Sequence, residues 1–188
     1  MFLDIGVGIL AAIFASYLYP GGNLLLFSAI GIFFSLLPDL DFIYYKLDKR
    51  KRLEKGYAHR NLFHLPLLYL PFGTLLVWML FGNLWGLLFM ITSFLHFIHD
   101  SIAYGRGVKW LYPFSNDSYA FIYLYSRVVK SGLWNPIFIF NKESIVKFDE
   151  EHGDENWIEN IFYKFHPIAV VELVVFVISL IVLMVYVR

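Results

Sequence analysis

The residues of this sequence best suited to chemistry are histidines and aspartates beside apolar segments. The stretch SFLHFIHDSIAYGRG, residues 93–107, ends an apolar run and contains His96, His99 and Asp100. On a helix, His96 and Asp100 differ by about 40° of rotation and one turn of rise, so both side chains can reach one ion. An imidazole and a carboxylate at this spacing are candidate metal ligands, although HxxxD alone occurs by chance in many helices.

Two other segments carry the same residue types. LLPDLD places Asp39 and Asp41 two residues apart, a spacing that suits an extended or turn conformation in which alternate side chains share a side. Two close carboxylates repel, which raises the pKa of one of them unless a cation lies nearby. AHRNLFH places His59 and His64 five residues apart, which is off one helical face. A divalent cation would account for all of these groups together.

Composition indicates a membrane protein. Of 188 residues, 59% are hydrophobic, 20% aromatic and only 16% charged, whereas soluble domains average about 25% charged residues. There is no cysteine, which excludes disulfides and thiolate metal sites. Any metal must be held by His, Asp, Glu or carbonyl oxygen. The net charge of zero excludes no class of partner.

Five apolar segments predict five membrane-spanning helices, since a span needs about 20 mostly apolar residues. PGGN at 20–23 and FGN at 81–83 are predicted turns that join neighbouring helices into hairpins. The predicted fold is all-α, a polytopic helical membrane protein with one membrane domain, 1–188, whose N-terminal helix is retained rather than removed as a signal peptide. The helices are expected at about 2–19, 22–37, 62–82, 84–103 and 167–187.

Basic residues predict the orientation. The segment 46–60 holds seven of the fifteen Lys and Arg residues, 104–166 holds seven more, and the two hairpin turns hold none. Cytoplasmic loops carry the Lys and Arg excess, so both segments and the N-terminus are expected at the cytoplasmic face. The two predicted hairpins also place eight ionisable residues from four helix ends at that face: Asp4, Asp39, Asp41, His59, His64, His96, His99 and Asp100.

The segment 104–166 is too long for a plain connector. Its aromatic, Gly and Pro content predicts short elements over 108–140 that lie against the membrane face. After an acidic loop, DEEHGDEN, the run WIENIFYKF has the spacing of an amphipathic helix in the interface.

Imidazole nitrogens with carboxylate oxygens are a common ligand set for zinc, iron or manganese. The donors exceed the needs of one tetrahedral ion and predict two divalent ions, with zinc favoured. Each group also has a structural explanation: Asp39 and Asp41 could cap a helix boundary, and His96 could be a packed core histidine. The joint pattern favours the metal.

These motifs carry a resemblance. PDLD, HRNLFH and HFIHDSIAYGRGVKWLYPF, in this order within about residues 1–114, resemble the YdjM-like family of predicted membrane-bound, metal-dependent hydrolases. The N-terminal histidine of the family has no counterpart in this chain, but Asp4 lies about where it would be, and a carboxylate can replace an imidazole as ligand. A weaker similarity links the family to zinc-dependent phospholipase C. The resemblance implies the metal ligands Asp39, Asp41, His59, His64, His96 and Asp100, and we add Asp4.

The expected function is hydrolysis of a phosphoester in a lipid or lipid-linked substrate at the cytoplasmic face, with Asp39, Asp41, His96 and Asp100 as catalytic residues. The expected partners are the lipid bilayer and that substrate, not nucleic acid. Three basic residues beside the motifs could bind a phosphate or could instead fix the topology: Arg60, Arg106 and Lys109.

A second class of function stays open, in which the protein binds metal without catalysis, for transport, sensing or structure. A transporter should place ionisable groups near the membrane midplane. Within the predicted spans only Glu172 qualifies, about four or five residues into the last one, and this shallow position argues against transport. Glu172 could support the metal site, act as a general base, or form an interhelical hydrogen bond.

Overall fold

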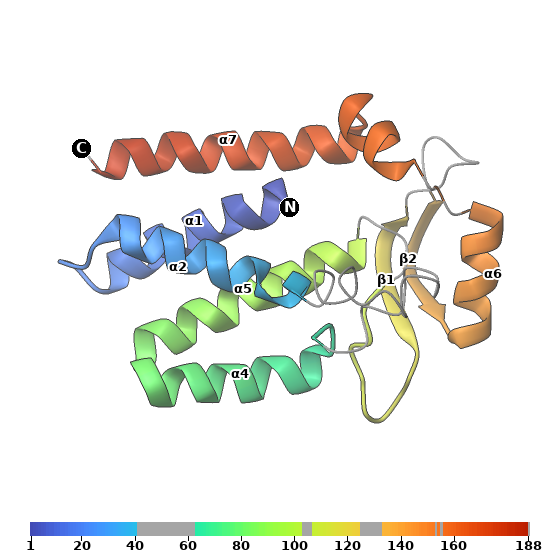
Figure 1. The fold of residues 1–188 in the computed structure, drawn as a ribbon, viewed down its shortest axis with the longest axis horizontal. Helices are drawn as coiled ribbons and strands as arrows, with labels where there is room; N and C mark the ends of the chain where they lie inside the picture. Colours follow the sequence, from blue (N-terminus) through green and yellow to red (C-terminus); the bar gives the residue numbers. More distant parts are fainter. Residues whose placement is uncertain (41–62, 103–106, 125–132, 153, 155, 188) are drawn as a thin grey trace. The chain divides into compact units, whose positions relative to one another are not determined.

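The computed structural model describes residues 1–40, 63–102, 107–124, 133–152, 154 and 156–187. The chain is mostly helical, as predicted, but it also contains a two-stranded sheet that the all-α prediction lacks (Figure 1). The elements are α1 (Phe2–Leu18), α2 (Leu24–Leu36), η1 (Leu37–Asp39), α4 (Pro66–Phe81), α5 (Asn83–Ile102), β1 (Ser118–Leu124), β2 (Leu133–Phe140), α6 (Lys142–His152), η4 (Glu159–Tyr163) and α7 (Pro167–Val187).

Helices α1, α2, α4, α5 and α7 lie in the five apolar segments predicted from the sequence. Two of them, α5 and α7, are long and apolar enough to cross a membrane. The others have 17, 13 and 16 residues, which is about 26, 20 and 24 Å at 1.5 Å per residue, less than the roughly 30 Å of a hydrocarbon core. Five membrane crossings therefore stay a prediction.

The chain forms two compact units. The helical unit contains Met1–Leu40, Tyr69–His96 and Pro167–Arg188, and the sheet unit contains Asp41–Leu68 and Phe97–His166. Within the helical unit, α1 packs against both α2 and α7 (Figure 1). Helix α5 belongs to both units, since it passes from His96 to Phe97. A single domain over 1–188 is not tested by this division.

The two predicted turns are confirmed. Gly21 has a φ of +93° and Gly82 a φ of +91°, a conformation that glycine adopts without steric cost. Asn23 then caps α2, because its Oδ1 accepts a hydrogen bond from the Leu26 N–H at 3.1 Å. The Gly82 N–H donates to the Trp78 carbonyl at 2.8 Å. These residues turn the chain between α1 and α2 and between α4 and α5.

Helices α1 and α2 approach each other at a pair of buried glycines. A Cβ placed on Gly8 would lie 2.6 Å from the backbone nitrogen of Ile32, and a Cβ on Gly31 would collide with the Gly8 carbonyl. Only residues without a side chain permit this backbone contact. The α1–α2 hairpin is therefore closely packed, and the start of α1 and the end of α2 have fixed relative positions.

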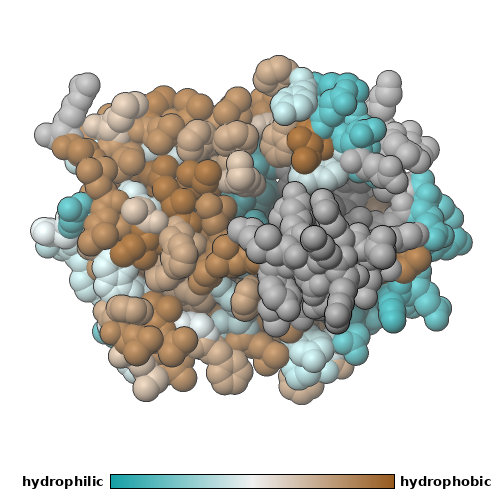
Figure 2. Space-filling view, in the orientation of Figure 1, coloured by the Kyte–Doolittle hydropathy of each residue, from teal (hydrophilic) through white to brown (hydrophobic). Residues whose placement is uncertain are grey.

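The outer surface of the helical unit is apolar. Hydrophobic side chains cover much of the visible surface of its helices in Figure 2. On α7, Val171 and Met184 are each 59% exposed, although they are large apolar residues. An apolar surface of this extent is unusual in soluble proteins and fits contact with lipid.

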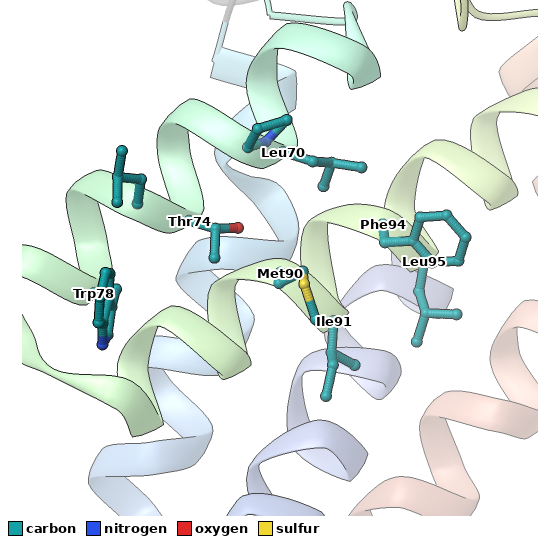
Figure 3. A pocket seen from close by; sticks show the side chains of 9 residues that line it. Leu70, Thr74, Trp78, Met90, Ile91, Phe94 and Leu95 are labelled. Carbon is teal, nitrogen blue, oxygen red and sulfur yellow. The ribbon is translucent and has the colours of Figure 1, made fainter.

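A hydrophobic groove of about 640 Å³ lies between α4 and α5 within the helical unit (Figure 3). Met90, Ile91, Phe94 and Leu95 contribute to it from one face of α5, and His96 lies on the opposite side of that helix by its position in the 3.6-residue repeat. The groove therefore belongs to the outer surface and not to the predicted site. Its remaining lining residues are Leu70, Pro71, Thr74, Leu75 and Trp78.

The sheet unit contains β1 and β2 in antiparallel pairing, with a bulge between Phe121 and Ile122. One face of the sheet packs against α6 through Ala120, Phe140 and Ile145. Helix α6 ends at His152, so part of the stretch predicted as an acidic loop is helical.

A short helical turn lies where the interfacial amphipathic helix was predicted. It includes η4, and Ile161 within it is fully buried, whereas Trp157 and Phe165 are exposed. The position of this run in the membrane interface stays a prediction.

Candidate metal centre

Several of the residues predicted to form the site lie in the described part of the chain: Asp4, Asp39, His64, His96, Asp100 and Lys109. Four others lie outside the described residues: Asp41, His59, Arg60 and Arg106. The candidate site is therefore built below from the former group alone.

In the helical unit, His96 lies between two aspartates. Its side chain is 1% exposed, its Nδ1 is 3.1 Å from Oδ1 of Asp4, and its Nε2 is 3.8 Å from Oδ1 of Asp39. Asp4 lies in the first turn of α1, and Asp39 ends η1 directly after α2. Because the α1–α2 hairpin reverses the chain, these two carboxylates come to one end of it, and α5 supplies the imidazole.

Asp4 has positive charge on its other side. The α-amino group of Met1 lies 2.9 Å from Oδ2 of Asp4 and 3.4 Å from Oε2 of Glu172 on α7. Both carboxylates are buried, and a buried charge needs such a partner. An ionised carboxylate only accepts hydrogen bonds, so the contact of an ionised Asp4 with His96 requires the proton on Nδ1. In the neutral imidazole the lone pair then lies on Nε2, on the side of Asp39.

In the sheet unit, a second His–Asp pair is present. Nε2 of His64 lies 3.1 Å from Oδ2 of Asp100, and both side chains are buried. His64 comes shortly before α4, and its ring packs edge-on against Phe97 at a centroid distance of 6.0 Å. Asp100 lies in the last turn of α5.

Helix α5 contributes to both pairs. His96 and Asp100 are one turn apart on this continuous helix, as the HxxxD spacing predicted. In the described part of the chain, Asp39, His64, His96 and Asp100 are the group of side chains that could hold a metal ion. Two imidazole nitrogens and two carboxylate oxygens suit zinc, manganese or iron.

Other residues of α5 and of the segment after it complete the description of this region. His99 is buried on α5 but is not a member of this group. After α5, the Trp110 indole N–H donates to Oγ of Ser101 at 2.9 Å. Burial lowers the pKa of the adjacent Lys109, and the positive charge of Lys142 lowers it further.

The family follows from comparison with known sequences. A family model described as YdjM inner membrane protein matches residues 4–188. The chain belongs to this family. The match confirms the resemblance predicted from the three motifs and extends it to the sheet unit and α7, and YdjM membership accounts for the apolar outer surface of the helices. No curated protein and no solved structure shows significant similarity to this YdjM-family chain.

The structure adds two relations that the sequence of this YdjM-family member does not contain. Asp4 was predicted as a metal ligand, and it is found against the Nδ1 nitrogen of His96. Glu172 was singled out as the ionisable residue in a predicted span, and it lies near the same α-amino group as Asp4. Its apolar surroundings in α7 were the available signal, because a carboxylate in such a segment has a function or a partner.

Proposed function

We propose that this YdjM-family protein is a membrane-embedded, metal-dependent hydrolase that cleaves a phosphoester in a lipid or lipid-linked substrate at the cytoplasmic face. The observation that carries the proposal is the group Asp39, His64, His96 and Asp100, which could hold a metal ion. Asp41 and His59 are proposed as further ligands that allow a second ion. The proposed resemblance to zinc-dependent phospholipase C rests on the same types of ligand.

The residues of the site have separable tasks. His64 and His96 would bind a metal through Nε2, and Asp39 and Asp100 would bind it through carboxylate oxygen. When bound, a divalent ion such as zinc supplies a Lewis acid and lowers the pKa of water to about 7. Asp4 holds the His96 ring in one orientation and one tautomer. Asp39 is the most exposed of the four, with 46% of its side chain accessible, so substrate would approach from its side.

Basic residues would bind the substrate phosphate. Lys109 follows α5 by a few residues, and Arg60 and Arg106 are its predicted companions. Arginine can bind a phosphate through two parallel hydrogen bonds. A phosphate near Lys109 would offset the burial and the repulsion from Lys142 that lower its pKa.

The membrane topology is part of the proposal. Helices α5 and α7 are proposed to cross the bilayer, with α1, α2 and α4 as the remaining membrane helices. The cytoplasmic position of the site follows from the basic segments 46–60 and 104–166.

A non-enzymatic metal-binding role is the alternative. Its support is Glu172, a carboxylate that is 1% exposed in α7, although its shallow position in that helix favours sensing or a structural role over transport. A transporter or sensor would use such a group for ion passage or for coupling to a helix movement.

The test uses vesicles that contain phosphatidic acid or a phosphodiester lipid, with metal-free and with zinc- or manganese-loaded protein. Hydrolysis of the lipid phosphoester is monitored by ³¹P NMR. We expect turnover with metal, its loss in His96→Ala, and its retention in His166→Ala, a matched change of a histidine outside the group. Metal bound in the wild type and lost in His96→Ala, without turnover of any lipid phosphoester, would favour the alternative. Turnover that persists in metal-free protein and in His96→Ala would refute the proposal.

A further inference from the structure

The β1–β2 hairpin has two unlike faces. Its inner face packs against α6 (Figure 1). On its outer face, Ile137 pairs with Phe121 and Ile139 pairs with Tyr119. The two isoleucines are 54% and 60% exposed, which is unusual for large apolar residues on neighbouring outward positions of one strand. This outer face, defined by Tyr119, Phe121, Ile137 and Ile139, is therefore an apolar surface on which both isoleucines are exposed.

Charged residues are found on the other side of this layer. Helix α6 covers the inner face of the sheet, and its Lys147 and Glu151 form an ion pair at 3.8 Å with side chains 76% and 54% exposed. The layer of sheet and helix is thus amphipathic, with a charged helical side and an apolar side on the sheet. Amphipathic elements of this kind settle at the boundary between water and hydrocarbon.

The position of the hairpin in the sequence restricts what can cover it. The residues between Ile102 and Pro167 connect α5 to α7, which among the described helices are the two that are long and apolar enough to cross a membrane. If both cross, as proposed above, the two ends of this connection are held at the same membrane face. The apolar face of the hairpin is then kept close to lipid by two covalent attachments and is continuous in sequence with the lipid-facing helices.

We propose that the outer face of the β1–β2 hairpin contacts the lipid bilayer, at the boundary between headgroups and acyl chains. The contact is shallow, since peptide groups at the edges of a sheet must keep hydrogen bonds to water and cannot enter hydrocarbon. It also has a consequence for the proposed function, on which the spanning of α5 and α7 depends: the sheet unit, which contains His64 and Asp100, is held at the depth of lipid headgroups. That is the depth of a phosphoester in a membrane lipid.

The absence of cysteine makes site-directed spin labelling direct. We would label Ile137→Cys and Ile139→Cys on the outer face, Lys147→Cys on α6 as the water-exposed control, and Val174→Cys on α7 as the reporter of spanning. Each full-length protein is reconstituted into phosphatidylethanolamine–phosphatidylglycerol vesicles. Power-saturation spectroscopy then compares accessibility to oxygen, which concentrates in hydrocarbon, with accessibility to a water-soluble nickel chelate. Circular dichroism verifies that each labelled protein is folded.

We expect the ratio of oxygen to nickel accessibility to be highest at 174, intermediate at 137 and 139, and lowest at 147. A ratio at 137 and 139 equal to that at 147, with 174 in hydrocarbon, would overturn the bilayer contact and leave the spanning helices intact. A water-like ratio at 174 would refute the spanning proposal and the bilayer contact together. Dipolar broadening at 139 that disappears on dilution with unlabelled protein would identify a second copy as the cover instead. Because none of these readouts uses turnover, a failure of the hydrolase proposal would be seen separately.

Discussion

Asp4 provides the sharpest test of the site. In the structure, this carboxylate accepts a hydrogen bond from Nδ1 of His96 at 3.1 Å in a buried environment. Exchange of the carboxylate for the amide oxygen of Asn keeps a hydrogen bond and removes its charge. A charge-assisted bond contributes about 1 kcal/mol more than a neutral one, so Asp4→Asn should weaken metal affinity about fivefold by this conversion. Asp4→Ala removes the bond, and loss of such a partner typically costs about 10–100-fold in metal affinity.

The assay is an equilibrium titration of metal-free protein in detergent with zinc against a chromophoric chelator. Asp117→Asn serves as the matched control, since Asp117 contacts Ser115 and lies outside the metal group. A graded loss, with Ala more severe than Asn and with unchanged stoichiometry, supports an orienting role.

Two other results would contradict this reasoning. Equal and nearly complete loss in Asn and Ala, with fewer ions bound, would show that Asp4 is itself a ligand, as the sequence alone predicted. Wild-type affinity in Asp4→Ala would show that the contact with His96 is irrelevant to metal binding.

Three other predictions follow from the packing and the charges. Gly8→Ala should lower the free energy of unfolding by about 1–3 kcal/mol, because the added Cβ would overpack against α2. Chemical denaturation measures this change. Gly21→Ala is the comparison, because the space around Gly21 is open and the substitution tests only the strain of the turn. Lys142→Gln should raise the pKa of Lys109, read by NMR of ¹³C-methylated lysines. The pKa of Lys109 is lower in the folded chain than in the unfolded chain. Between these two pKa values the unfolded chain binds more protons, so the free energy of unfolding rises with pH. Lys142→Gln should reduce this rise. Chelation should lower the melting temperature of wild type but not of His96→Ala, because a ligand at about 100 times its Kd stabilises by roughly 2.7 kcal/mol; equal shifts in both would contradict a metal held by His96.

The helices and turns could be predicted because their signals are local. Glycines and Asn23 mark the turn between α1 and α2, and long apolar runs mark the helices on either side. The spacing of His96 and Asp100 likewise depends only on one helix. The sheet had a signal too, since SYAFIYL and IFIF are rich in aromatic and β-branched residues, but Pro136 and the bulge at Phe121 interrupt the regular alternation of a strand.

The relations among distant residues could not be predicted in the same way. Asp4 and His96 are 92 positions apart, and nothing in the sequence states which imidazole nitrogen faces which carboxylate. The end of α6 was assigned to a loop because its acidic residues were taken as solvated. Asn141 was the local sequence signal that a helix begins there. In the structure, its Oδ1 accepts a hydrogen bond from the Ser144 N–H at 2.8 Å.

The glycine contact between α1 and α2 limits how this site could be altered, by evolution or by design. Asp4 and Asp39 are carried at one end of a hairpin whose helices are already in backbone contact at Gly8 and Gly31. A longer side chain at position 4 needs more space, and spreading these helices to provide it would open their packed contact. The adjustment would have to come from α5, by a rotation or a shift along its axis. Variation in metal preference should therefore be sought in substitutions along α5, coupled to position 4, and not in the hairpin itself.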